Sequence, residues 1–346
     1  MMLNRWKLTG VGLILTLGLI SCGFFCGSSA AQQKMEIKIL TTSMGSSGFI
    51  AGFALSEVLN KHVPNIQAAA LESKSYGLNM ETYLRASETR KNHVYGSDLV
   101  AWSLARDGRP PFTTAVGTGL RAIGVFLPAG GFSIVTYDPN LKRPKDLDGM
   151  KIATVAKGSI LDVVPSMISD YYGISLKHER IGMAKSKDAI IDGLLKIASL
   201  PVGTKWQPEI WTVGTLIMEM LAKQQTYLIE MSKAEIEGMV AKSGITVSPE
   251  FLQKGALGYN CPPKDTWVVG CCNCWFVDEN MDENLVYLIV KAIIDHPSGF
   301  ERHYPQLKYI RNYIGSATLP KGEKYWHPGA LKVFKEAGLK LGEWAR

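Results

Sequence analysis

The sequence lacks the short motifs that mark the commonest nucleotide-binding and hydrolytic sites. It contains no G-x-x-x-x-G-K-[ST], no H-E-x-x-H, no G-x-S-x-G, and no G-x-G-x-x-G after a strand. Its six histidines are dispersed, and we interpret each as a surface or packing residue, not as a general base. We therefore expect no catalytic residue, no metal ligand and no cofactor.

Long apolar runs and blocks of like charge are also scarce. After residue 31, no stretch approaches the roughly 20 apolar residues that a membrane-spanning helix needs. The 38 basic and 31 acidic residues are scattered without a run of Lys or Arg, so no nucleic-acid partner is indicated. The mild positive balance is compatible with an anionic ligand. There is no internal repeat and no low-complexity tract.

Cysteine is rare and confined to two places. Cys22 and Cys26 lie near the N-terminus, and the other four lie close together at positions 261, 271, 272 and 274. We favour one or more local disulfides among these four, with buried thiols as the alternative. A metal site is less favoured, because the spacing offers neither C-x-x-C nor a nearby histidine.

The N-terminal segment has the order of a secretory signal. Arg5 and Lys7 precede the apolar run Leu8–Ile20, and small residues follow. Two cleavage patterns are present: Leu19-Ile20-Ser21-Cys22 resembles a lipobox, whereas Ser29-Ala30-Ala31 resembles an ordinary signal peptidase site. We expect residues 1–31 to be a signal peptide and the mature protein to be periplasmic, with acylation at Cys22 as the alternative.

The first part of the remaining chain predicts a strand, a polar loop and a helix. Met35–Leu40 alternates apolar and polar residues, and Phe49–Val63 has apolar residues at helical spacing. The loop between them contains Ser43, Ser46 and Ser47. Because the first N–H groups of a helix lack internal partners and favour negative charge, we expect this loop to bind an anion, with helix capping as the alternative role for any one serine.

Two more predicted strands also end in polar loops. Ala68–Leu71 precedes a loop with Tyr76 and Asn79, and His93–Gly96 is followed by Ser97. In an open α/β sheet, ligands gather at the carboxyl ends of the strands. These residues are therefore candidate ligand contacts.

A second strand, loop and helix begin near the middle of the chain. Lys151–Val155 predicts a strand, Gly158 and Ser159 a loop, and Ile160–Tyr172 a helix. A helix N-terminus here that faces the first one across a cleft would let two lobes share one ligand. Trp206 is a candidate wall for a planar ligand, or a core or lobe-edge residue. The later segment Glu283–Asp295 predicts a helix that packs in the core and carries no site residue.

The length supports two lobes, since about 315 residues remain after residue 31. We predict an α/β, two-lobed fold, with each lobe a mixed sheet flanked by helices and the ligand in the interlobe cleft. Residues 34–127 plus about 262–346 would form the first lobe, and 132–258 the second. The chain would cross between lobes near 126–136 and 256–270.

Four segments match the pattern of one known family: His327–Ala330, Phe334–Leu339, Asp148-Gly149 with Gly158-Ser159, and Asn284–Tyr287. In these segments the chain resembles the TAXI solute-binding subunits of tripartite ATP-independent periplasmic (TRAP) transporters. The similarity runs from about Ile37 to Leu339 and is strongest in the closing His-Pro-Gly-Ala and Glu-x-Gly-Leu pattern. The first loop departs from the family, which typically has Gly-x-x-Gly-Thr-Tyr-Tyr where this chain has Ser43–Phe49.

The resemblance implies the two-lobed, type II-like fold of periplasmic binding proteins. It also implies a monomeric binding protein that closes over a small organic anion, a carboxylate or an amino acid such as glutamate, and delivers it to a membrane permease. It also implies that the loop 43–48, Asn79, and Gly158 with Ser159 contact the ligand. A binding protein that feeds a membrane sensor is an alternative. An exported enzyme that uses the cysteine cluster or Asp98 is the least favoured reading.

Overall fold

The computed structural model describes residues 34–343, except positions 43, 45, 87, 208, 209, 318, 320 and 321. The predicted signal peptide, both cleavage patterns and Ser43 lie outside the described residues. From Lys34 onward the chain forms one compact unit. Within the described residues, every helix is too short or too polar to cross a membrane.

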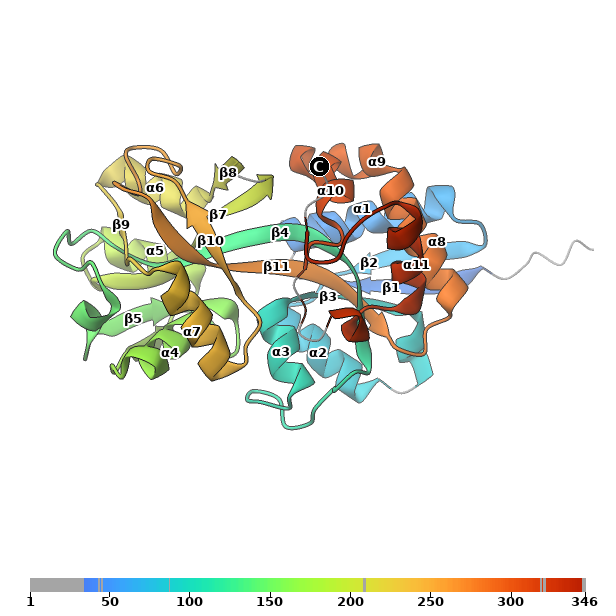
Figure 1. The fold of residues 1–346 in the computed structure, drawn as a ribbon, viewed down its shortest axis with the longest axis horizontal. Helices are drawn as coiled ribbons and strands as arrows, with labels where there is room; N and C mark the ends of the chain where they lie inside the picture. Colours follow the sequence, from blue (N-terminus) through green and yellow to red (C-terminus); the bar gives the residue numbers. More distant parts are fainter. Residues whose placement is uncertain are drawn as a thin grey trace, which may run out of the picture. The chain divides into compact units, whose positions relative to one another are not determined.

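One mixed sheet runs through the described part of the chain (Figure 1). The strands are β1 (Met35–Leu40), β2 (Ile66–Leu71), β3 (His93–Asp98), β4 (Leu120–Thr136), β5 (Lys151–Thr154), β6 (Lys177–Arg180), β7 (Ile197–Gln207), β8 (Ile210–Val213), β9 (Tyr227–Leu228), β10 (Ser248–Leu252) and β11 (Thr266–Asp278). Their order is β2-β1-β3-β11-β4-β7-β5-β6, with β10 on β11, β8 on β7 and β9 on β4.

The sheet contains two parallel groups, β2-β1-β3 and β7-β5-β6. Strands β11 and β4 lie between the groups and are antiparallel to each other and to their outer neighbours. We call the first group with its flanking helices the first lobe, and the second group with its helices the second lobe. Strand β4 pairs with β11 over Leu120–Gly130 and with β7 over Gly130–Thr136, so it belongs to both lobes.

Helices cover both faces of the sheet (Figure 1). The α-helices are α1 (Ser47–His62), α2 (Tyr76–Arg85), α3 (Leu99–Arg106), α4 (Ile160–Tyr172), α5 (Met183–Ile191), α6 (Thr215–Lys223), α7 (Lys233–Ser243), α8 (Glu283–Asp295), α9 (Pro297–Glu301), α10 (Ile310–Tyr313) and α11 (Pro328–Glu336). The short 3-10 helices are η1 (Glu88–Asn92), η2 (Pro144–Leu147), η3 (Pro305–Tyr309) and η4 (Gly322–Tyr325).

The predicted helices 160–172 and 283–295 are confirmed as α4 and α8. Helix α8 begins where the Asp282 carboxylate accepts a hydrogen bond from Leu285 N at 2.8 Å, which satisfies one of the free N–H groups of the first turn. Helix α4 ends at Gly173, which has φ +67° and closes the helix in the left-handed conformation that glycine adopts without strain.

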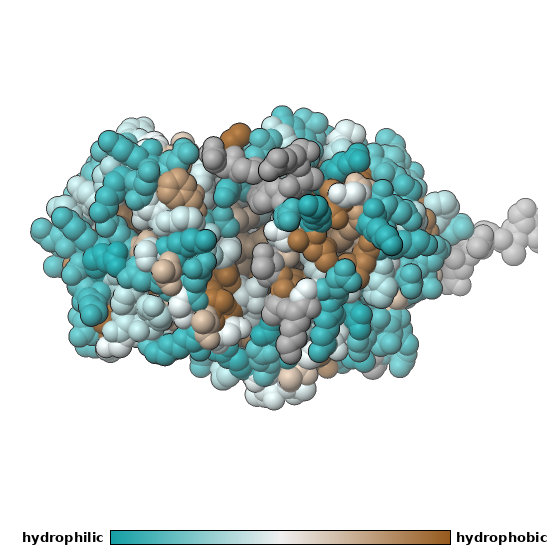
Figure 2. Space-filling model, viewed as in Figure 1, coloured by the Kyte–Doolittle hydropathy of each residue, from teal (hydrophilic) through white to brown (hydrophobic). Residues whose placement is uncertain are grey.

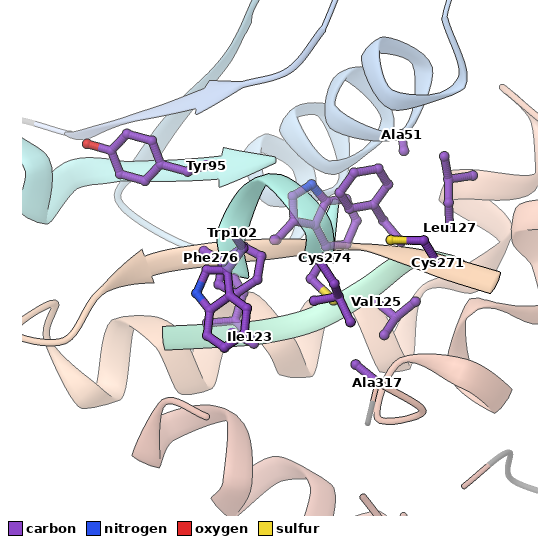
Figure 3. Close-up of a cluster of buried hydrophobic side chains, with 14 of the residues drawn as sticks. Ala51, Tyr95, Trp102, Ile123, Val125, Leu127, Cys271, Cys274, Phe276 and Ala317 are labelled. Atoms are coloured by element: carbon purple, nitrogen blue, oxygen red, sulfur yellow. The ribbon is translucent and has the colours of Figure 1, made fainter. Parts of the chain in front are cut away.

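The core of the first lobe packs onto the middle of β11. Trp102 of α3 stacks on Phe276 with ring centroids 5.5 Å apart, and Figure 3 shows these rings beside Ile123 and Val125 of β4. This cluster also contains apolar side chains of α4 and α7, whereas a smaller cluster lies within the second lobe. The core therefore fixes β11 in place beside the strand ends of the first lobe.

In this structure all four clustered cysteines are free thiols, so the expected disulfide is not formed here. Cys261 is fully buried in the smaller cluster, whereas Cys271 and Cys274 belong to the larger one. Cys271 and Cys272 are consecutive on a strand, so their side chains point to opposite faces. The strand therefore keeps the side chains of Cys271 and Cys272 apart, although the two residues are neighbours in the sequence.

Asp162, in the first turn of α4, ties that helix to the edge strand β6. Its side chain is only 5% exposed and accepts hydrogen bonds from His178 Nδ1 at 2.7 Å and Arg180 Nε at 3.0 Å. Burial alone would raise the pKa of this carboxyl, but the bonds from His178 and Arg180 outweigh it and hold the pKa below the usual value. The charged form of Asp162 therefore stabilises the second lobe.

We predict that Asp162→Asn lowers the free energy of unfolding at pH 7 by about 1.5–3 kcal/mol, the range of a hydrogen bond to a charged group. Because the folded-state pKa lies below the unfolded value of roughly 3.9, this contribution is present above about pH 4. It is lost as the pH falls through the folded pKa. Urea unfolding of both proteins between pH 3 and pH 8 measures it.

The matched control is Asp192→Asn, since Asp192 is exposed at the end of α5 in the same lobe. We expect it to stay within about 0.5 kcal/mol of the unsubstituted protein. An equal effect of the two substitutions, or a loss at Asp162 that does not shrink at low pH, would contradict the role given to Asp162.

Candidate functional site

Polar side chains from three elements form a hydrogen-bonded network at the carboxyl edge of the first parallel group. Asn273 of β11 donates from Nδ2 to the phenol oxygen of Tyr76, at 2.8 Å. The hydroxyl of Thr42 also hydrogen-bonds to Tyr76 and lies 2.6 Å from Ser46 Oγ. Ser46 in turn caps α1 by accepting from Phe49 N at 3.1 Å. The network therefore runs from β11 to the N-terminus of α1.

Gly48 makes this network possible. A Cβ atom at this position would lie 2.5 Å from the phenol oxygen of Tyr76 and 2.8 Å from Thr42 Oγ1. Both distances are shorter than real carbon contacts. Any larger residue at Gly48 would therefore push Tyr76 and Thr42 away from the first turn of α1. Ser47, the first residue of α1, is half-buried beside it.

Tyr76 keeps its proton. Burial, with the nearby charge of Asp98 adding to it, raises the pKa of the Tyr76 phenol well above its usual value of 10.0, although the bonds from Asn273 and Thr42 oppose the shift. A neutral phenol both donates and accepts hydrogen bonds. Tyr76 is therefore a hydrogen-bond donor at the strand ends at any physiological pH.

Asp98 and Ser97 close the third strand. The Asp98 carboxylate caps α3 by accepting from Ala101 N at 2.6 Å, and burial raises its pKa to about 6. Ser97 is fully buried and its hydroxyl donates to the carbonyl of Asp98 at 3.0 Å. The Ser97 hydroxyl is thus used by a backbone carbonyl at the end of β3. Asp98, in contrast, places a weakly acidic carboxyl beside Tyr76 and Cys271.

Asn79 joins the carboxyl ends of β1 and β3 through its side-chain amide. It is fully buried, and its Nδ2 donates to the carbonyls of Thr41 at 2.7 Å and Gly96 at 2.8 Å. Its Oδ1 has no partner in the structure. The side-chain amide N–H groups are therefore engaged by β1 and β3, and only the carbonyl oxygen is unengaged.

In the second lobe, Gly158 and Ser159 form the loop at the start of α4. Gly158 has φ +83°, and a Cβ there would lie 2.6 Å from Cδ of Pro111 in the first lobe. Ser159 is the N-cap of α4, but its side chain makes no capping bond. Its Oγ is buried without a partner. A hydroxyl and the free N–H groups of a 13-residue helix are thus available together.

Trp206 packs between the lobes. It lies on β7 and is 2% exposed, and its ring contacts Tyr304 and Tyr313 of the first lobe with centroids 5.4 and 6.3 Å away. Its Nε1 is buried without a partner. The structure therefore places Trp206 against aromatic residues of the other lobe.

A cavity of about 130 Å³ lies where the lobes meet the crossing strands. Its lining includes Leu99, Ala129, Ser248, Glu250, Cys271, Cys272 and Ser316. Figure 2 shows apolar side chains at the surface in the middle of this face, with mostly polar surface on both sides. Neither Ser46 nor Ser159 lines this cavity.

The structure thus groups the predicted site residues into three sets. Ser46 and Tyr76 share the network, Asn79 and Ser97 support the strand ends beneath it, and Gly158, Ser159 and Trp206 belong to the second lobe. Sequence reasoning missed Thr42 and Asn273. Asn273 had a usable signal, since it is the one strongly polar residue in the apolar run Trp267–Val277. In the described residues, no group of His, Cys, Asp or Glu side chains has the geometry of a metal site.

Comparison with known proteins places the chain in a family. Residues 39–338 match the sequence pattern of the NMT1-like family. No significant match was found among curated protein sequences. Among solved structures, MatC from Rhodopseudomonas palustris with bound malate has a TM-score of 0.50 and 10% identity, covering 87% of this chain and 95% of that chain.

Two further structures are similar at lower scores. A TctC solute binding protein from Polaromonas has a TM-score of 0.48 and 12% identity, covering 88% of this chain and 96% of its own. The periplasmic aliphatic sulphonate binding protein SsuA from Escherichia coli has a TM-score of 0.47 and 13% identity, covering 79% and 77%. The chain therefore belongs to the NMT1-like family and has the mixed α/β fold of two-lobed periplasmic binding proteins.

Proposed function

We propose that this chain is a periplasmic solute-binding protein that captures a small organic anion between its lobes. The observation that carries this proposal is the buried, unpartnered hydroxyl of Ser159 at the N-terminus of α4. On the first lobe, the network of Thr42, Ser46, Tyr76 and Asn273 ends at the N-terminus of α1. Both helix ends favour negative charge.

The ligand we favour is a carboxylate or an amino acid such as glutamate. Hydroxyls, a neutral phenol and free backbone N–H groups all donate hydrogen bonds to a carboxylate. Each charge-assisted bond contributes roughly 1.5–3 kcal/mol. Two or three such bonds therefore offset much of the free energy that the ligand loses with its translational and rotational freedom. MatC, one solved structure with a similar fold, carries malate, which supports a small carboxylate.

Ligand capture would occur by closure of two lobes about the crossing strands. We propose that residues 34–127 with about 262–346 form one lobe and residues 132–258 the other, with crossings near 126–136 and 256–270. Strand β4 pairs with β11 and β7, and strand β11 pairs with β3 and β10, so each contacts elements of both sides. The cavity lies beside them. These observations support a hinge at β4 and β11.

The wider role that we propose is delivery of the ligand to a TRAP-type secondary transporter, as a TAXI subunit acting as a monomer. The resemblance of His327–Ala330 and Phe334–Leu339 to that family supports it. We also expect export, with removal of residues 1–31 or acylation at Cys22. The chain would act as a binding protein and not as an enzyme.

A calorimetric screen of the purified exported chain tests the ligand class. The panel is malate and other dicarboxylates, glutamate and other amino acids, and aromatic acids. We expect one class to bind with a Kd of about 1 μM or tighter, corresponding to about −8 kcal/mol. The neutral amide of the best ligand is the control and should bind more weakly. Silence across the panel from a folded sample would contradict the proposal.

Ser159→Ala tests the second-lobe contact. Because Ser159 Oγ has no partner without ligand, we expect the thermal stability to be equal or higher and the affinity for the screened ligand to fall about 10- to 100-fold. Ser169→Ala is the matched control, since Ser169 Oγ is also buried and unpartnered in the same helix but near its other end. Equal losses of affinity in both variants would exclude a contact specific to Ser159.

Gly48→Ala tests the first-lobe network. The new Cβ would clash with Tyr76 and Thr42, so we expect ligand affinity to fall and the free energy of unfolding to drop by about 1–3 kcal/mol. Gly77→Ala is the control, because Gly77 is also the second residue of its helix and a Cβ there has its nearest neighbour at 3.8 Å. We expect Gly77→Ala to stabilise by up to about 1 kcal/mol and to keep ligand affinity.

A further inference from the structure

Two thiols of β11 lie on the same face of the strand and in contact. Cys272 and Cys274 are separated by one residue, and their sulfur atoms are 4.0 Å apart. Asn273 lies between them, and its side chain points to the other face, where it donates to Tyr76. A bond between the two sulfurs would therefore form a small covalent ring whose backbone includes Asn273, the residue that donates to Tyr76 in the candidate site.

The strand is already irregular at this point. The register of β11 with β4 shifts between Cys271 and Asn273 and again between Asn273 and Cys274. Two residues of a regular strand span about 6.6 Å, at the upper end of the Cα separation of about 4.4–6.8 Å that disulfides accept. A local irregularity eases the approach of the two sulfurs. Cys272 also borders the cavity of about 130 Å³, which leaves room for its side chain to turn.

The other cysteines of the described chain are not placed to compete. Cys261 is fully buried in the apolar cluster of the second lobe. Cys271 is 2% exposed and faces Asp98 and the first turn of α3 on the opposite side of the strand. In the described part of the chain, the sulfur–sulfur contact joins Cys272 to Cys274, so the geometry selects this pair.

We propose that Cys272 and Cys274 form a reversible disulfide across Asn273, and that its formation changes the hydrogen bond from Asn273 to Tyr76. The effect on ligand binding rests on the proposed function, whereas formation of the bond does not. An exported chain meets an oxidising environment. The oxidant is a disulfide compound, either a protein disulfide or a small one such as oxidised glutathione.

The reaction is thiol–disulfide exchange in two steps. One cysteine thiolate attacks a sulfur of the oxidant, which forms a mixed disulfide and releases the first thiolate of the oxidant. The second cysteine then attacks the cysteine sulfur of the mixed disulfide and releases the second. The two protein thiols lose two electrons, the oxidant gains them, and the two protons end on the released thiols.

The reaction should be slow near neutral pH. The contact with the Cys274 thiol, together with burial, raises the pKa of Cys272 well above its usual value. Because the thiolate is the attacking species, the rate of exchange should rise between pH 6.5 and pH 8.5. The pair would therefore respond to sustained oxidation and not to brief exposure.

Mass spectrometry of the purified exported chain tests the bond. The protein is incubated with oxidised glutathione, unfolded, alkylated and digested. We expect the peptide with residues 272–274 to be lighter by roughly 2 Da for the two lost hydrogens and unalkylated at Cys272 and Cys274, with Cys261 and Cys271 alkylated. Dithiothreitol should reverse the change. Alkylation of both Cys272 and Cys274 after oxidation, or a link to Cys261 or Cys271, would overturn the proposal.

Single substitutions separate the thiols. Cys272→Ser and Cys274→Ser should each abolish the change in mass, whereas Cys271→Ser should leave it intact. Cys271 is adjacent to the pair and, like Cys274, is buried, so it is a matched control for folding. If Cys271→Ser abolished the change in mass and the other two variants kept it, the reactive thiol would be Cys271 and the proposal would be overturned.

Hydrogen exchange then tests the coupling without any ligand. Oxidised and reduced protein are compared at β11 and at the start of α2, which carries Tyr76. We expect a change of exchange at the first turn of α2 in the unsubstituted protein and none in Cys272→Ser. A disulfide that forms without this change would refute the coupling. A failed ligand screen would leave both results standing, so failure of the proposed function remains distinguishable.

Discussion

The arrangement of the site depends on two strands that must satisfy backbone hydrogen bonds in both lobes at once. Strand β4 exchanges β11 for β7 as its partner at Gly130. The neighbouring Gly131 leaves space for the indole of Trp211, whose ring atoms would lie 2.7 Å from a Cβ there. Small residues at this exchange let the sheet continue without a break. Every ligand contact that we propose is positioned relative to this continuous pair of strands.

Local patterns in the sequence predicted two helices that begin after a polar residue. Helix α8 begins after Asp282 and helix α4 begins after Ser159, and both were predicted with their observed bounds. Strand β11 had no such marker, because Trp267–Val277 is apolar throughout except at Asn273. A short apolar run fits a buried strand or a buried helix equally well. Its place in the middle of the sheet comes from pairing with β3 and β4, which no local pattern contains.

The candidate site divides in the same way. The serines at helix starts follow from the strand, loop and helix order, and Ser46 does cap α1. The network around Tyr76 does not follow from it, since Asn273 meets Tyr76 only after β11 inserts beside β3. Asn79 shows a further limit. The resemblance to TAXI subunits implied that Asn79 contacts the ligand, yet its amide donates to the carbonyls of Thr41 and Gly96, so residue type alone does not give its contacts.

Unpaired polar groups at the strand ends cost stability in the ligand-free protein. A buried hydroxyl without a partner costs about 1–3 kcal/mol, and Ser159 Oγ is one. Burial raises the pKa of Asp98 to about 6, so holding this carboxylate in its charged form above that pH also costs stability. Absence of a partner is not diagnostic by itself, because Ser169 Oγ is unpaired too. What distinguishes Ser159 is its position at a helix N-terminus, where a bound carboxylate would gain both the hydroxyl and the helix N–H groups, and so offset that cost.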